Sequence, residues 1–240
     1  MFIARWGLTT VGLLTVILAL SLLLIPDGVG RWVAGGVAAA LWLFSLNFFR
    51  NPPRTPPPGA DHLVSSADGV VADSETVDAP DFIAGRALRI GVFMNVFDVH
   101  VNRAPADGTV AWLHYAPGRF LDVRHPTAIH ANEAQNIGLE LDVPGHEGLR
   151  IIVRQLAGLV ARRIVCPCSE GDHWQRGAVF GMIKFGSRLE LWIPEGRATA
   201  TVTIGQRVRA GETVLAVLIP SPPDAPAPAP SAGQQEVDNG

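Results

Sequence analysis

The sequence predicts a mainly β fold: a compact β-sandwich or barrel with lipoyl-carrier-like repeats, preceded by an N-terminal helical hairpin that is transmembrane or membrane-embedded. Two uncharged apolar runs near the N-terminus predict the hairpin. Gly-containing turn motifs recur between short stretches of alternating polarity and predict the β domain. Pro-rich composition in 51–59 and 220–240 sets the limits of the folded part.

The hairpin is predicted from the length of its two apolar runs. WGLTTVGLLTVILALSLLLI (6–25) and WVAGGVAAALWLFSLNFF (32–49) contain no charged residue, and a membrane-spanning helix needs about 20 apolar residues. A cleaved signal peptide is the alternative, but no small-x-small exit follows the first run and the second begins almost at once. We therefore expect residues 1–50 to form a hairpin with both ends on one side. A monotopic hairpin that enters one leaflet keeps the same side.

Positive charge around the hairpin predicts its orientation. Arg5, Arg50 and Arg54 flank the outer ends, whereas Arg31 in the connecting loop is balanced by Asp27. Because positive residues stay on the cytoplasmic side, both ends are expected there. The chain is thus predicted in the cell (inner) membrane, with everything after residue 50 facing the cytoplasm.

Composition separates the rest into three parts. Residues 51–59 form a Pro-rich linker, predicted to be a semi-rigid spacer that lifts the following domain from the membrane. Residues 60–219 are the predicted β domain, and 220–240 a disordered Pro/Ala-rich tail. The formal charge of −3 forms no basic stripe, so nucleic acid is not an expected partner.

Two pairs of segments inside the β domain repeat each other. SADGVVADSE (66–75) is echoed by PADGTVAWLH (105–114), and EGDHWQRGAVFGMI (170–183) by IGQRVRAGETVLAVL (204–218). Glycine supplies the positive φ that tight turns between short strands require. These units predict the sandwich or barrel and resemble biotinyl and lipoyl carrier domains.

The densest polar cluster lies in FMNVFDVHVNRAPADG (93–108). Asp98, His100 and Asn102 are spaced by two, so on a strand they share one face. That face could simply be solvated. An acid and an imidazole at this spacing could also let a carboxylate orient a histidine base. His125 follows in a loop-like segment, and the absence of HExxH or C-x-x-C spacing gives no reason to expect a metal.

A Gly-Ser pair interrupts the strand-like stretch MIKFGSRLELW (182–192), beside Lys184, the only lysine of the chain. No G-x-S-x-G motif surrounds Ser187, so a hydrolase nucleophile elbow is not predicted. The pair could be a bulge, or the serine could cut its own backbone. Attack of Ser187 Oγ on the unhindered Gly186 carbonyl would give an ester, and elimination and hydrolysis would then leave a pyruvoyl group.

Several motifs together resemble the phosphatidylserine decarboxylase family, in its short bacterial pyruvoyl-dependent class. They cover about residues 48–219 and are FFRNPPR, VFMNVFDVHVNRAPADGTV, RQLAGLVARRIVC, GDHWQRGAVFGMIKFGSRLELWIP and IGQRVRAGETVLA. The resemblance implies a self-processing zymogen, a carboxy-lyase, cut between Gly186 and Ser187. The β chain is then 1–186 and the α chain 187–240, which has 240 − 186 = 54 residues.

The resemblance also implies roles for single residues. Ser187 becomes the covalent pyruvoyl cofactor, which forms a Schiff base with the substrate amine and acts as the electron sink. Asp98 matches the family's triad acid. His125, in APGRFLDVRH, matches the triad histidine, and His100 is the substitute base.

Further implications concern substrate and partners. The substrate is a membrane phospholipid, phosphatidylserine, and the products are phosphatidylethanolamine and CO2. The partners are the two chains of an α/β heterodimer cut from one precursor, and a higher oligomer is left open. Arg103, Arg119 and Arg188 are candidates for holding the lipid phosphate.

Two other functions compete with this hypothesis. One is a membrane-anchored lipoyl- or biotinyl-type carrier modified on Lys184, and the other is an adaptor without chemistry. Neither predicts the shared face of Asp98 and His100 or the FGSR sequence.

Overall fold

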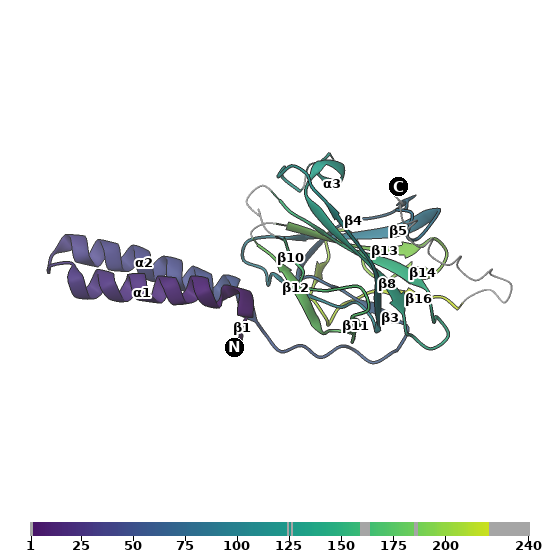
Figure 1. The fold of residues 1–240 in the computed structure, drawn as a ribbon, viewed down its shortest axis with the longest axis horizontal. Helices are drawn as coiled ribbons and strands as arrows, with labels where there is room; N and C mark the ends of the chain where they lie inside the picture. Colours follow the sequence, from purple (N-terminus) through teal and green to yellow (C-terminus); the bar gives the residue numbers. More distant parts are fainter. Residues whose placement is uncertain (1, 124, 126, 159–163, 185–186, 221–240) are drawn as a thin grey trace, which may run out of the picture.

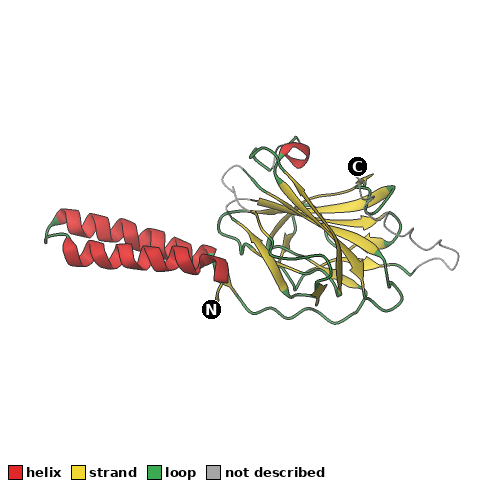
Figure 2. Ribbon diagram, in the orientation of Figure 1, coloured by secondary structure: helices red, strands yellow, loops and turns green. Residues whose placement is uncertain are grey.

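The protein consists of a helical hairpin projecting from one end of a β domain, as Figures 1 and 2 show. The coordinates are a computed structural model that describes residues 2–123, 125, 127–158, 164–184 and 187–220. Gly186 and the tail from 221 onward therefore lie outside the described residues. The mainly β prediction is confirmed.

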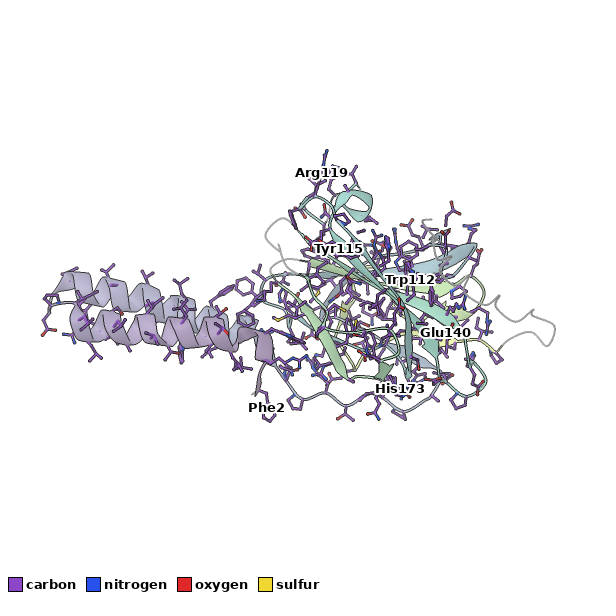
Figure 3. All side chains as sticks on the ribbon, in the orientation of Figure 1. Phe2, Trp112, Tyr115, Arg119, Glu140 and His173 are labelled. Atoms are coloured by element: carbon purple, nitrogen blue, oxygen red, sulfur yellow. The ribbon has the colours of Figure 1, made fainter. Side chains whose placement is uncertain are left out.

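The hairpin is formed by α1 (Leu8–Leu24), preceded by the 3-10 helix η1 (Arg5–Gly7), and α2 (Val29–Phe48). A Cβ on Gly35 would lie 2.8 Å from Leu22 Cδ2, so glycine permits the close approach of the two helices. Large apolar side chains cover the outside of the pair and point away from it (Figure 3). Both helices are long and apolar enough to cross a membrane.

An eight-stranded antiparallel sheet curls around the core of the β domain (Figure 2). In spatial order its strands are β11 (His173–Trp174), β7 (Gly108–Ala116), β8 (Ala134–Leu141), β9 (Arg150–Leu156), β13 (Ser187–Pro194), β5 (Arg86–Met94), β4 (Gly69–Asp78) and β15 (Arg207–Val208). β13 is therefore a central strand, paired on both sides.

Two three-stranded sheets close the other side of the core. One has the order β10 (Ile164–Val165), β12 (Val179–Ile183), β6 (Val101–Arg103), and the other β14 (Ala198–Ala200), β16 (Val214–Leu218), β3 (His62–Val64). A short pair, β1 (Phe2–Ile3) with β2 (Arg50–Asn51), joins the two ends of the hairpin. The small helix α3 (Ala128–Ala131) lies in the loop between β7 and β8.

The core fills the space between these sheets because side chains alternate along each strand. Leu189, Leu191 and Ile193 of β13 belong to the main apolar cluster inside the curled sheet. Arg188 and Glu190 are also buried, but they lie on the opposite face of the same strand. The central strand therefore carries charge on its outer side.

The repeated segments occupy equivalent places. β15 pairs with β4 as β11 pairs with β7, and β16 pairs with β3 as β12 pairs with β6, each time with a bulge at the corresponding point. Asp68 Oδ1 accepts a hydrogen bond from Ala210 N, and Asp107 Oδ1 accepts one from Arg176 N, both at 2.8 Å. The domain thus contains an internal duplication. Its likeness to lipoyl carriers stays a prediction.

The predicted spacer is bound to the β domain along its length. Arg103 Nη2 donates to Asn51 Oδ1 at 2.7 Å and to the Pro52 carbonyl at 2.9 Å. Arg54 forms an ion pair with Asp68 at 2.9 Å. Figure 1 shows this segment running along the outside of the β domain. Arginines of both segments thus hold the spacer against the β domain, and its role in lifting the domain from the membrane stays a prediction.

Candidate active site

Ser187 is the first residue of the central strand β13. It pairs with Met94, the last residue of β5, and its Oγ donates to Met94 Sδ at 3.3 Å. The Ser187 side chain is completely buried. Its neighbour Arg188 pairs with strands on both sides, through Phe93 and Leu156. The position of Ser187 is therefore fixed by the sheet.

The residues before Ser187 belong to a different sheet. β12 ends at Ile183 in a three-stranded sheet, whereas β13 begins at Ser187 in the eight-stranded one. Between them the chain passes from one sheet to the other, and Phe185 and Gly186 in this passage are outside the described residues. The predicted cleavage bond thus lies at a crossover between sheets.

A compact turn connects the two sides of this crossover. Asn95 N donates to Asp98 Oδ2 at 2.9 Å, and Asp98 N donates to the Asn95 carbonyl at 3.0 Å. The turn starts directly after Met94, the partner of Ser187. Beyond it, the carbonyl of His100 accepts a hydrogen bond from Ile183 N at 3.3 Å. The structure therefore brings Asp98, His100 and Ser187 to one corner of the domain.

The His100 ring is held by the backbone. Its Nδ1 lies 3.0 Å from the carbonyl of Asp98, and the ring of Phe48 packs against it at a centroid distance of 4.2 Å and a tilt of 34°. A carbonyl only accepts, so Nδ1 carries the proton and Nε2 keeps its lone pair. Nε2 is buried and has no hydrogen-bond partner among the described residues. An unpaired imidazole nitrogen of this kind can accept a proton.

Burial keeps His100 neutral. Desolvation is the largest cause and lowers the pKa of His100 from 6.5 to about 4, against the opposing effects of the carbonyl and charge of Asp98. Neither of the two alternatives that the residue spacing left open describes this geometry. The polar face is not solvated, because His100 and Asn102 are fully buried. The carboxylate of Asp98 does not orient the ring, because Asn95 N and Arg207 Nη1, at 3.3 Å, bind it instead.

His125 lies in an exposed loop just before α3, and its Nδ1 is 2.8 Å from Thr127 Oγ1. Asn132 ties this loop to the end of β9 by donating to the Ala157 carbonyl at 2.9 Å. Among the described residues no contact joins His125 to Ser187, Asp98 or His100. Its role as triad histidine stays a prediction.

The base of the hairpin forms one wall of the candidate site. Phe48, the last residue of α2, covers His100, and Arg50 Nη2 donates to the Phe97 carbonyl at 2.7 Å. Phe44, one turn earlier in α2, meets the ring of Phe97 edge-on at 6.4 Å. Sequence reasoning missed these residues, because nothing in the apolar pattern says which end of a helix contacts the domain.

Comparison with known proteins identifies the family of this chain. The family model described as phosphatidylserine decarboxylase matches residues 41–216. A phosphatidylserine decarboxylase proenzyme of Symbiobacterium thermophilum is 42% identical over 213 residues, which are 89% of this chain and 94% of the relative. The proenzyme of Solidesulfovibrio magneticus is 44% identical over 216 residues, covering 89% and 95%. The chain belongs to the phosphatidylserine decarboxylase family.

Membership of the phosphatidylserine decarboxylase family confirms the predicted class, a carboxy-lyase made as a proenzyme. The arginines that were predicted to bind the lipid phosphate are not well placed for that role. Arg103 binds the backbone carbonyls of Gly177 and Pro52. Arg119 points outward beside α3 (Figure 3).

The third candidate, Arg188, belongs to a buried ion cluster beneath Ser187. Arg188 donates to Asp73 at 2.7 Å and to Glu190 at 2.8 Å. The completely buried Glu190 also lies near Arg154, at 3.6 Å, and Arg89, at 3.9 Å. The i and i+2 spacing of Arg188 and Glu190 was the sequence signal for a charged strand face.

Proposed function

We propose that this protein is a self-cleaving zymogen that decarboxylates phosphatidylserine to phosphatidylethanolamine and CO2 at the inner membrane. The observation that carries the proposal is the corner formed by Ser187, the start of a central strand, and the 95–100 turn, which contacts the strands on both sides of the predicted cleavage bond. Family membership supports the same chemistry.

Self-cleavage starts with the hydroxyl of Ser187. Oγ attacks the Gly186 carbonyl carbon, the peptide C–N bond breaks, and an ester joins the two residues. His100 Nε2 takes the hydroxyl proton and passes it to the departing nitrogen of Ser187, with Asp98 fixing the turn, and His125 is the further candidate for a base. Loss of the Ser187 α-proton then eliminates the Gly186 carboxylate. Hydrolysis of the resulting dehydroalanine releases ammonia and leaves the pyruvoyl group.

The surroundings of Ser187 fit a pyruvoyl terminus. After cleavage, strand pairing would hold the new N-terminus of the α chain from residue 187 onward, and this terminus would face a buried, partly apolar corner. The group supplies a carbonyl that withdraws electrons from the substrate. Around it, Phe48 excludes water, and the lone pair of His100 Nε2 takes up a proton during the reaction and delivers it to the carbon that the carboxylate leaves.

The two chains would stay together after cleavage. In the α chain, β13 lies between β5 and β9, and β15 and β16 pair with β4 and β3, all of which belong to the β chain. Separating the chains would therefore remove the centre of the sheet. This arrangement supports an α/β heterodimer.

The membrane placement rests on the hairpin. We place residues 1–50 in the inner membrane, with the Pro-rich segment 51–59 and the catalytic domain 60–219 on the cytoplasmic side and 220–240 as a tail. Arg5 and Arg50 at the outer ends support this orientation, while Arg31 in the connecting loop is neutralised by its ion pair with Asp27.

Processing provides the test. A denaturing gel and intact mass of the purified protein should show two chains, the smaller with 54 residues, from 240 − 186, and blocked to Edman sequencing. Ser187→Ala should leave one full-length chain without decarboxylase activity, whereas Ser169→Ala, in an exposed loop, should process normally. A single uncut wild-type chain with lipoate or biotin on Lys184 would support the carrier hypothesis instead.

A further inference from the structure

A cavity of about 580 Å³ lies at the junction of the hairpin and the β domain. The hairpin contributes Trp6, Thr9 and Thr10 to its lining. The domain contributes the segment from β10 to Pro167 and, after β12, Lys184. No step of the proposed reaction uses this cavity, although it borders the chain that leads to the cleavage bond.

Three of the side chains that line the cavity can donate hydrogen bonds to an anion, namely Lys184, Thr9 and Thr10. Lys184 is the only lysine of the chain, and its Nζ lies 5.6 Å from the centre of the Phe49 ring, at the base of the hairpin. An ammonium and two threonine hydroxyls can all donate to phosphate oxygens. Aspartate and glutamate are absent from the residues that line the cavity in the described part of the chain.

The position of the cavity indicates the source of the phosphate. Thr9 and Thr10 lie in the first turn of α1, where the apolar run begins, and Arg5 stacks over Trp6 at 4.8 Å. Tryptophan and arginine at the end of an apolar helix mark the headgroup level of a bilayer. A ligand that enters here from the membrane presents a phosphodiester.

The distance to Ser187 suits phosphatidylserine. Lys184 and Ser187 are three positions apart, so in the uncut chain their Cα atoms lie within roughly 10 Å of each other. Strand pairing of Ile183 in β12 and of Ser187 in β13 holds the two sides of the cleavage bond in their sheets. In this lipid a single oxygen joins the phosphate to the serine carbon skeleton that carries the amine and the carboxylate. A phosphate held at Lys184 would therefore leave the reacting groups directed toward Ser187.

We propose that this cavity binds the phosphodiester of a phospholipid headgroup, with Lys184 as its cation, and so positions the substrate at Ser187. The proposal rests on the proposed function and gives the substrate phosphate the site that Arg103, Arg119 and Arg188 do not offer.

Steady-state kinetics of the processed full-length enzyme test it with dioctanoyl phosphatidylserine. Lys184→Gln should raise KM about tenfold or more and leave kcat within about twofold, because a charge-assisted hydrogen bond is lost. Lys184→Arg should stay within about threefold of the wild type. The matched control is Arg86→Gln at the far end of β5, roughly 26 Å from Met94 by the rise of a strand, and it should change nothing.

A substrate without phosphate separates recognition from general damage. O-octyl-L-serine keeps the amine and the carboxylate but lacks the phosphodiester, so its KM should be the same for wild type and Lys184→Gln. If Lys184→Gln impairs both substrates equally, or impairs neither, the proposal is wrong.

Binding to uncleaved protein gives a readout that does not need activity. In the full-length Ser187→Ala protein, calorimetric titration with sn-glycero-3-phospho-L-serine should show affinity that Lys184→Gln lowers at least tenfold. Equal affinity with and without Lys184 overturns the inference even if the decarboxylase is active. Equally tight binding of inorganic phosphate overturns the lipid source. Absence of wild-type processing would instead refute the proposed function, while this titration would still test the cavity.

Discussion

Replacing Phe48 by alanine tests whether the hairpin controls the chemistry of His100. The Phe48 ring packs against His100 with the ring centres 4.2 Å apart, and burial is the main cause that lowers the pKa of His100 from 6.5 to about 4. Removing the ring admits water beside the imidazole, so the pKa should rise toward its ordinary value. Charges facing the ring, Asp98 and Arg50, are unchanged by the substitution.

The size of the effect follows from the two pKa values. At pH 5 a histidine with a pKa of about 4 is about nine-tenths neutral, whereas one with a pKa of 6.5 is only about 3% neutral. If neutral His100 is the base for cleavage, Phe48→Ala should process up to about thirtyfold more slowly than wild type at pH 5. The two proteins should differ much less at pH 8, where both rings are neutral.

The assay is the rate of chain cleavage between pH 4.5 and 8, followed on denaturing gels after synthesis in a cell-free system with lipid vesicles. Phe48→Leu is a milder second variant, because a large cavity costs about 3–5 kcal/mol and could impair folding. Leu41→Ala, an exposed position of the same helix, is the control. Identical pH profiles for wild type, Phe48→Ala and Phe48→Leu would refute the reasoning.

Three further predictions concern stability and the ion cluster. Glu190→Gln should lower the free energy of unfolding by about 3–5 kcal/mol, because Arg154 and Arg188 lose a completely buried carboxylate, although Arg188 keeps Asp73. Chemical denaturation should show this loss, and a change as small as that of exposed Glu195→Gln would contradict it. Gly91→Ala should slow cleavage, because the new Cβ would lie 2.2 Å from Nη2 of Arg188, next to the reacting serine; unchanged cleavage kinetics would show that this arginine is not needed there. The free energy of unfolding should fall as the pH drops from 6.5 to about 4, because His100 binds a proton in the unfolded chain but not in the native protein. The loss is about 3 kcal/mol at 1.36 kcal/mol per pH unit. His100→Asn should remove this part of the pH dependence of thermal unfolding.

The parts of the fold that could be predicted are those that depend on local sequence pattern alone. Apolar runs of membrane length gave the hairpin, and Gly turns between alternating stretches gave the strands. The repeats at 66–75 and 105–114 could be recognised because each contains the same Asp-Gly pair at the start of a strand. Pairing between strands far apart in the sequence, such as β13 between β5 and β9, depends on long-range contacts that leave no local signal.

The site residues stay a prediction, and their geometry could not be predicted from the sequence. Spacing by two placed Asp98 and His100 close together, yet it could not show that the backbone carbonyl of Asp98 binds the ring. A turn precedes β6, so the alternation of a strand does not extend back to Asp98. The contacts of Phe48 and Arg50 could not be predicted from local pattern either, because they join the hairpin to a loop about 50 residues away in the sequence.

Because the β domain contains an internal duplication, equivalent residues of its two halves can be compared. Asp68 and Asp107 accept hydrogen bonds from equivalent backbone amides in the two halves, so both residues stabilise a turn. The carbonyl of His100 accepts from Ile183, and at the equivalent place the carbonyl of Asp61 accepts from Leu218. The same backbone bond thus supports a buried imidazole in one half and an acid in the other. Asp68 and Asp107, which match between the halves, can be assigned to folding, whereas His100, whose counterpart is Asp61, marks a position where the two halves differ.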